Sequence, residues 1–181
     1  MSERVFFTSD THFSDERTLT LSRRPFATTQ EMDVAMIERW NATVAPDDIV
    51  YHLGDFGNYE IAKQLHGKIR LLVGNYERDD LHGGKVTLVR LEELFDTVTL
   101  NDLVCLSLDE KYMTLVHEPS HRLSSAVRFH LFGHIHKLQM VKWNGLNVGV
   151  DCHDFTPVNF ETVLFYKNAI EKHYDDEVFG A

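Results

Sequence analysis

Short runs of β-branched and aromatic residues alternate with segments of helical periodicity in the first half of the chain. Three runs are typical of buried strands: RVFFTSD (4–10), DIVYHLGD (48–55) and KIRLLVGN (68–75). Residues 28–44 and 59–67, which lie between them, place apolar residues at helical spacing. Strands that alternate with helices usually pair in parallel, so this half predicts an α/β core.

The second half of the chain predicts a different arrangement. Residues 95–118 read as strands joined by tight turns, and the Asn144-Gly145 pair predicts a hairpin within 128–151. Residues 160–174 predict a last strand followed by a short helix. Together the two halves predict two packed mixed sheets with helices outside them.

Length, charge and cysteine content limit the classes of function. Because the chain has 181 residues, we expect one domain over 1–181, with 172–181 as a solvated tail. The net charge of -10 argues against broad binding to a nucleic-acid backbone, although it allows an anionic substrate. Two cysteines make no disulfide framework, and no apolar run has membrane-spanning length or follows a leader pattern. We therefore expect a cytoplasmic protein with no membrane partner.

Residues that can bind metals follow the predicted strands at their carboxyl ends. They are two carboxylates, one amide and four imidazoles: Asp10, His12, Asp55, Asn75, His117, His134 and His136. The carboxyl ends of strands in open α/β sheets form a crevice, so these side chains are expected to converge there. Oxygen and nitrogen ligands without thiolate suit Mn, Fe, Zn or Ni. Such a large set favours two metals about 3.5–4 Å apart.

Five motifs resemble those of the calcineurin-like metallophosphoesterases. They are SDTH, LGDF, GNYE, VHE and FGHIH, and they occur in that family's order from Asp10 to His136. The later run NVGVD also resembles the small bacterial and phage members. The resemblance implies a four-layer α/β/β/α sandwich that hydrolyses phosphate esters, here a phosphoester small molecule or a nucleotide.

The resemblance also implies a role for each ligand. Asp10, His12 and His136 would hold one metal, manganese by first choice, and Asn75, His117 and His134 would hold the other. Asp55 would bridge the two ions, so that a shared hydroxide attacks phosphorus in line. On this basis Asp55, Asn75 and His117 are expected to be catalytic.

The motif after strand 68–75 departs from the family at the general acid. The family commonly has His after the Asn, and one branch supports it with an Asp; here Tyr76 and Asn58 occupy these positions. Without this pair we expect phosphodiesters or activated esters to be favoured over monoesters. Tyr76, His121 and His153 are the candidate substitutes for the acid.

Several alternatives remain open in the sequence. HEPSH (117–121) matches the zinc-peptidase pattern, but a strand precedes His117 and Pro119 disfavours a helix there. The missing acid pair also allows a metal-binding scaffold without turnover. Asp151 is either a support for the site or a turn residue. Five arginines are candidates for phosphate contacts, with Arg23 and Arg24 equally a solvated pair: Arg17, Arg23, Arg24, Arg78 and Arg122.

Overall fold

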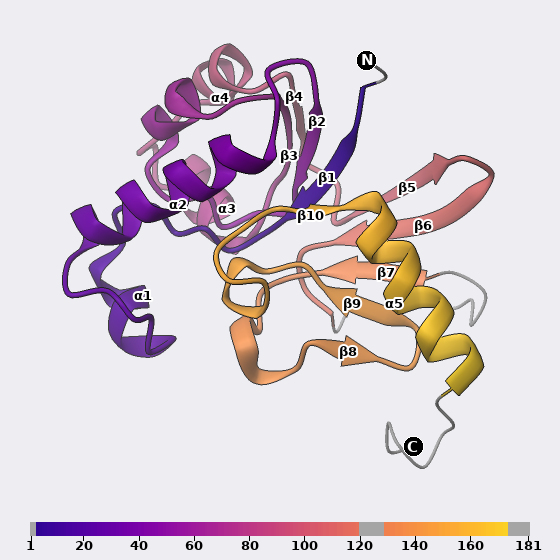
Figure 1. Cartoon of the computed structure of the whole chain (residues 1–181). Helices are drawn as coiled ribbons and strands as arrows, with labels where there is room; N and C mark the ends of the chain where they lie inside the picture. Colours follow the sequence, from indigo (N-terminus) through magenta and orange to yellow (C-terminus); the bar gives the residue numbers. More distant parts are fainter. Residues whose placement is uncertain (1–2, 120–128, 174–181) are drawn as a thin grey trace.

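The computed structural model describes residues 3–119 and 129–173, and it contains two five-stranded sheets (Figure 1). The first sheet has the order β10 (Val158–Asn159), β1 (Val5–Thr8), β2 (Ile49–His52), β3 (Lys68–Leu72) and β4 (Thr97–Thr99). The second has the order β5 (Leu103–Leu108), β6 (Lys111–Val116), β7 (Phe129–Phe132), β9 (Gly145–Asn147) and β8 (Val141–Lys142). Both combine parallel and antiparallel pairs, which confirms an α/β fold with two mixed sheets.

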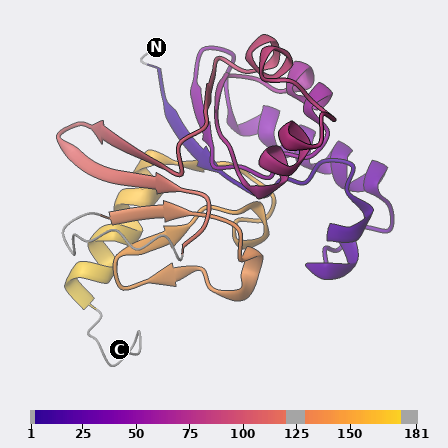
Figure 2. The same ribbon diagram turned by 180° about the vertical axis from the view of Figure 1, so that it is seen from behind.

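Helices cover the sheets and connect their strands. The α-helices are α1 (Glu16–Leu21), α2 (Thr29–Thr43), α3 (Asn75–His82), α4 (Leu88–Leu94) and α5 (Phe160–His173). Three short 3₁₀ helices are η1 (Tyr59–Gln64), η2 (His136–Leu138) and η3 (Val150–Cys152). Figure 2 shows from behind that α2, α3 and α4 gather about the first sheet, whereas the second sheet lies on the other side. No helix in the described ranges combines the length and apolar character needed to cross a bilayer.

Side chains of β1 point alternately to the two faces of the first sheet and contribute to two separate apolar clusters. Phe6 packs with Met36 and Trp40 of α2 on one face of the first sheet. Phe7, which points to the opposite face, packs with Leu131 of β7 between the sheets. Successive side chains of a strand point to opposite faces, so one strand supplies both cores. This sandwich holds the carboxyl ends of β1, β2 and β3 beside the end of β7.

The last predicted strand lies earlier than expected. β10 comprises only Val158–Asn159, and α5 begins at Phe160. The Asn159 side chain accepts the Thr162 N–H at 2.8 Å, an N-cap bond that starts the helix where the sequence pattern suggested continued strand. Lys172 and His173 form the end of α5, and residues 174–181 of the expected tail lie outside the described residues.

Candidate metal centre

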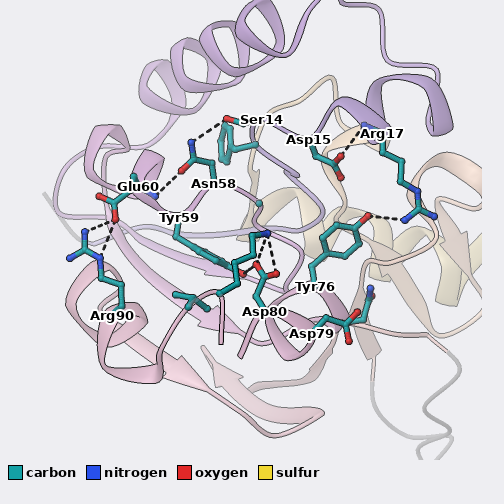
Figure 3. A pocket seen from close by; sticks show the side chains of 15 residues that line it. Ser14, Asp15, Arg17, Asn58, Tyr59, Glu60, Tyr76, Asp79, Asp80 and Arg90 are labelled. Carbon is teal, nitrogen blue, oxygen red and sulfur yellow. Dashed lines mark hydrogen bonds and ion pairs between the residues drawn. The ribbon is translucent and has the colours of Figure 1, made fainter. Parts of the chain in front are cut away.

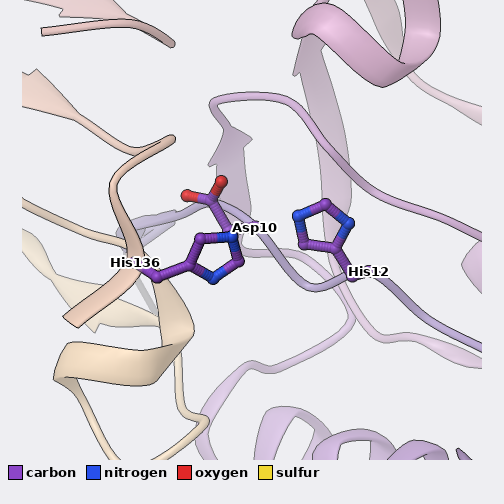
Figure 4. A group of neighbouring side chains, drawn as sticks. All are labelled: Asp10, His12 and His136. Atoms are coloured by element: carbon purple, nitrogen blue, oxygen red, sulfur yellow. The ribbon is translucent and has the colours of Figure 1, made fainter. Parts of the chain in front are cut away.

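Three side chains from distant positions meet beyond the end of β1. Asp10, His12 and His136 bring one potential ligand atom each within 4.8 Å of the others (Figure 4). The ring centroids of His12 and His136 are 5.2 Å apart and nearly parallel. Asp10 and His12 are buried, so their polar atoms have little access to water.

A second group forms beside the first. Asp55, His117 and His134 likewise place one potential ligand atom each within 4.8 Å of the others. Asn75 joins them, because its Oδ1 lies 2.9 Å from His117 Nε2 and 3.0 Å from His134 Nδ1. The structure thus brings all the residues of the expected ligand set into two adjacent groups.

Asp55 lies between the two groups. Its Oδ2 is 3.6 Å from Nε2 of His12, in the first group, and 3.4 Å from Nε2 of His117, in the second. The backbone N–H of Tyr76 donates to the other carboxylate oxygen, Oδ1, at 3.0 Å. One oxygen is therefore anchored by the protein, while the other faces both groups.

The hydrogen bonds of His117 leave a lone pair facing an oxygen. His117 Nδ1 lies 2.7 Å from the carbonyl oxygen of Leu53, which can only accept, so Nδ1 carries the proton. In the neutral ring Nε2 then has a lone pair, and it faces the acceptor Oδ1 of Asn75. Two facing acceptors repel each other, and a cation that both atoms coordinate, or a proton on the ring, would relieve this repulsion.

The charged groups around His117 also favour a cation at this position. Burial lowers the pKa of His117, but the hydrogen bond from His117 to Asp55 and the charges of Asp10 and Asp55 outweigh it and raise the pKa to about 9. The Asp55 pKa is lowered: burial acts to raise it, and the contact with His117 prevails. A cation is thus favoured at this position, and a proton supplies the charge where no metal does.

His12 has two buried ring nitrogens that lack hydrogen bonds, although Nδ1 lies 3.5 Å from Asp15 Oδ2 and Nε2 lies 3.6 Å from Asp55 Oδ2. Within the described part of the chain, neither Nδ1 nor Nε2 forms a hydrogen bond, although His12 is only 2% exposed. A buried polar atom left without a partner costs about 1–3 kcal/mol. Metal coordination would satisfy one of these nitrogens, so the donor set fits a bound ion.

The candidate ligands have an unusual backbone conformation. Five of them have positive φ: Asp10 (56°), His12 (46°), Asp55 (58°), His134 (68°) and His136 (50°). Non-glycine residues rarely adopt this conformation, and such strain is found most often at functional sites. His134 and His136, both in this conformation, lie in different groups, which is the division that the family resemblance implies.

Two glycines make room for the carboxylates. A Cβ atom on Gly133 would lie 2.3 Å from Oδ2 of Asp10, and one on Gly74 would lie 2.5 Å from Oδ1 of Asp55. Both distances are too short for a non-bonded contact. The glycines of the GNYE and FGHIH motifs therefore provide space for the ligands as well as turns.

Glu77, which has no predicted role, holds the loops that carry Asp55 and Asn75 of the second group. Its carboxylate accepts backbone N–H groups from Gly74 and Asp55 at 2.8 Å and from Phe56 at 2.7 Å. The side chain is fully buried. Glu77 thus joins the loop after β2 to the loop after β3. The GNYE motif contained this residue, but its three partners become visible only in the fold.

Arg24, Asp151 and His136 form a buried chain behind the first group. Arg24 donates to both carboxylate oxygens of Asp151 at 3.0 and 2.9 Å, and its Nη2 donates to the Asp10 carbonyl at 2.6 Å. Asp151 Oδ2 lies 2.7 Å from Nδ1 of His136, which leaves Nε2 of that ring for a metal. Arg24 is therefore neither a solvated residue nor a phosphate contact, and Asp151 supports a candidate ligand.

Tyr76 packs against the first group, as its position after Asn75 allows. The Tyr76 ring meets the His12 ring edge-on with centroids 4.6 Å apart, and its hydroxyl accepts a bond from Arg17 at 3.3 Å. Burial raises the pKa of Tyr76 above its usual value near 10. At neutral pH its hydroxyl is therefore a poor proton donor to a leaving group.

Other expected site residues have different neighbours. His153 lies 2.7 Å from the Asn147 carbonyl through Nε2 and belongs to neither ligand group, and burial lowers its pKa. Arg78 pairs with Asp102, and Arg23 is exposed. His121 and Arg122 lie outside the described residues. His117 directly follows strand β6, so the helical arrangement that a zinc peptidase needs at this residue is absent from the described part of HEPSH.

Comparison with known proteins adds information about the fold. No family model matches the chain. The chain is 25% identical over 179 residues to an uncharacterized protein of Methanocaldococcus jannaschii, and the match covers 89% of each protein. A solved structure, a protein of unknown function from Aquifex aeolicus, is 21% identical with a TM-score of 0.69 over 91% of this chain and 100% of that one. An archaeal phosphodiesterase, 21% identical over 81% of this chain and 82% of that one, has a TM-score of only 0.45, too low to support a conclusion about function. The Aquifex structure shows that this fold occurs in another protein along its whole length.

Proposed function

We propose that this protein is a dinuclear metal-dependent phosphoesterase. Asp10, His12 and His136 would hold one ion, Asn75, His117 and His134 the other, and Asp55 would bridge them. One observation carries the proposal: a single Asp55 oxygen faces His12 at 3.6 Å and His117 at 3.4 Å, one from each ligand group. A structural carboxylate would need only one of these partners.

The donor set favours divalent transition metals, with manganese the first choice among Mn, Fe, Zn and Ni. When bound, two such ions lower the pKa of a shared water and offset the charge of phosphate oxygens. The chain contributes the positions. Glu77 and the Tyr76 N–H hold Asp55, and Asp151 orients His136.

The surroundings of Tyr76 support a preference for diesters or activated esters. Tyr76 occupies the position where a histidine acid is expected, yet burial moves its pKa further from neutrality. Asn58 cannot support an acid by charge; its side chain instead caps η1 and donates to Ser14. Proton donation contributes about 10²–10⁴-fold to such reactions, so leaving groups that need no proton should react best.

Hydrolysis of bis(para-nitrophenyl) phosphate with added Mn²⁺ tests the proposal. We expect turnover by the wild type and a loss of at least about a hundredfold in Asp55→Asn, because the amide removes the bridging charge. Asp154→Asn is the matched control, since that carboxylate is 87% exposed and, among the residues that the structure describes, forms an ion pair only with Arg39. Equal rates in the wild type and Asp55→Asn would contradict the proposal.

A metal-binding scaffold without turnover is the second candidate, and the environment of Tyr76 favours it. A protein that binds two Mn²⁺ ions but hydrolyses no phosphoester in a broad panel would support the scaffold. Residual hydrolysis that persists after removal of the metal would support neither candidate.

A further inference from the structure

A cavity of about 910 Å³ opens next to the candidate metal centre (Figure 3). It lies between α3, the segment before α1 and the segment that enters η1. Asn75, a member of the second ligand group, lines its wall together with Tyr76 and Asp15, which both contact His12. A molecule held by the metal ligands could therefore extend directly into this cavity, whose volume suits a small organic group.

Most of the positive charge that lines the cavity is already neutralised within its wall. Lys85 donates to both carboxylate oxygens of Asp80, at 3.1 and 3.2 Å. Arg90 pairs with Glu60, another lining residue. Arg17 keeps its charge, but its one side-chain hydrogen bond among the described residues goes to the Tyr76 hydroxyl. Two of the three basic side chains are thus already paired with carboxylates.

Negative charge exceeds positive charge around the cavity. Four lining residues are acidic and three are basic: Asp15, Glu60, Asp79 and Asp80 against Arg17, Lys85 and Arg90. The carboxylate of Asp79 is exposed and has no ion-pair or hydrogen-bond partner within the described ranges. It therefore presents an uncompensated negative charge at the cavity.

Aromatic side chains line the same cavity. Phe13, Tyr59 and Tyr76 line the cavity, and Figure 3 shows the Tyr76 hydroxyl directed toward Arg17, with Asp79 at the other end of the tyrosine. A cavity lined by both aromatic rings and carboxylates favours an organic cation, because the quadrupole of a ring and the charge of an acid both attract it. The same surface accepts an uncharged group by burying apolar area.

Given the phosphoesterase function proposed above, we infer that this cavity binds the second alcohol group of a phosphodiester and selects it by charge. Cationic alcohols are preferred to uncharged ones, and alcohols that carry a further phosphate or carboxylate are disfavoured. Nucleic-acid ends and nucleotides with additional phosphates are then poor substrates.

Three diesters with the same para-nitrophenyl leaving group test this inference. Their second alcohols are choline, its uncharged isostere neohexanol, and carboxypropanol, which is anionic. Assays with Mn²⁺ at low ionic strength should give kcat/KM in the order choline, neohexyl, carboxypropyl, with about fivefold between the first and the last. The difference should lie mainly in KM and should shrink in high salt, because salt screens exposed charges.

Charge reversal at Asp79 tests whether this residue causes the preference for the cationic ester. Asp79→Lys should reduce the preference for the choline ester at least about threefold and leave the neohexyl ester unchanged. Glu38→Lys changes net charge equally on α2, where Glu38 is exposed and outside the cavity lining, and should leave the preference intact. Equal use of the choline and carboxypropyl esters by the wild type, or equal effects of the two variants, would overturn the inference.

An incorrect phosphoesterase proposal would give a different result from an incorrect assignment of the cavity. If no ester is hydrolysed, the phosphoesterase proposal is contradicted. Calorimetric titration of the unreacting Mn²⁺ protein with the same esters then measures the subsite alone. Tighter binding of the choline ester, lost in Asp79→Lys, would support charge selection, and equal affinities would reject it.

Discussion

Oε2 of Glu77 accepts the backbone N–H of Asp55 at 2.8 Å, so a buried carboxylate holds the loop that presents the proposed bridging ligand. The same oxygen accepts the Gly74 N–H at 2.8 Å, next to Asn75. Two ligand-bearing loops from different strands are thereby fixed relative to each other. Glu77 belongs to α3, so these hydrogen bonds let that helix position both loops of the candidate metal centre.

Glu77→Gln should weaken both folding and metal binding. The amide group of glutamine can accept with only one of its two polar ends, and its NH₂ would face a backbone donor. An unsatisfied buried group costs about 1–3 kcal/mol, so urea unfolding should show a loss of this size. Mn²⁺ affinity should fall in calorimetry. Glu38→Gln, at an exposed position of α2, should change neither quantity.

Asp151→Asn should weaken metal binding at the first group. Loss of the carboxylate that holds His136 Nδ1 removes the support for that ligand, and such changes typically cost about 10–100-fold in metal affinity. Arg24 also loses its buried charge partner, which should lower the unfolding free energy by about 3–5 kcal/mol. Mn²⁺ titration followed by electron paramagnetic resonance measures the affinity. Two sites of unchanged affinity would refute a supporting role for Asp151.

Tyr76→His should reduce the dependence of rate on the leaving group. In the wild type, log kcat/KM should fall steeply as the pKa of the leaving alcohol rises, because no group with a pKa near neutrality protonates it. A histidine at this position should flatten that slope. Tyr76→Phe is the control, and it should keep the wild-type slope. A wild type that hydrolyses activated and unactivated esters at the same rate would show that another acid is present.

Metal should stabilise the folded protein. At about a hundredfold excess of Mn²⁺ over Kd, one site contributes about 2.7 kcal/mol, which for a chain of this size raises Tm by about 5–10 °C relative to the chelated protein. Differential scanning calorimetry measures the shift. Gly133→Ala should abolish much of it, because the added methyl group would collide with Asp10 Oδ2. An unchanged Tm on chelation would argue against a metal site.

The sequence predicted that the candidate ligand residues would lie close together, because strand order brings them to one edge of the sheet. Asp10, Asp55 and Asn75 each follow a parallel strand of the first sheet, and the ends of parallel strands meet at one edge. The division of His134 and His136 between the two groups came from the family resemblance alone, because strand alternation would place residues two apart on one side, and the left-handed backbone at both residues breaks that alternation. Backbone strain of this kind leaves no periodic signal in the sequence.

Tertiary partners were the other features that sequence could not supply. Arg24 and Asp151 are 127 residues apart, and the Arg23-Arg24 pair has the composition of a surface turn. Only the fold shows that one arginine is exposed and the other is buried against Asp151. Similarly, Asn159 could equally have continued a strand, and its cap bond to Thr162 decides for the helix.

Anomalous diffraction at the manganese edge, from crystals grown with Mn²⁺, tests the central claim most directly. Two peaks are expected, one on each side of Asp55, the first bounded by Asp10, His12 and His136 and the second by Asn75, His117 and His134. A single peak, or peaks only outside these side chains, would contradict a dinuclear centre.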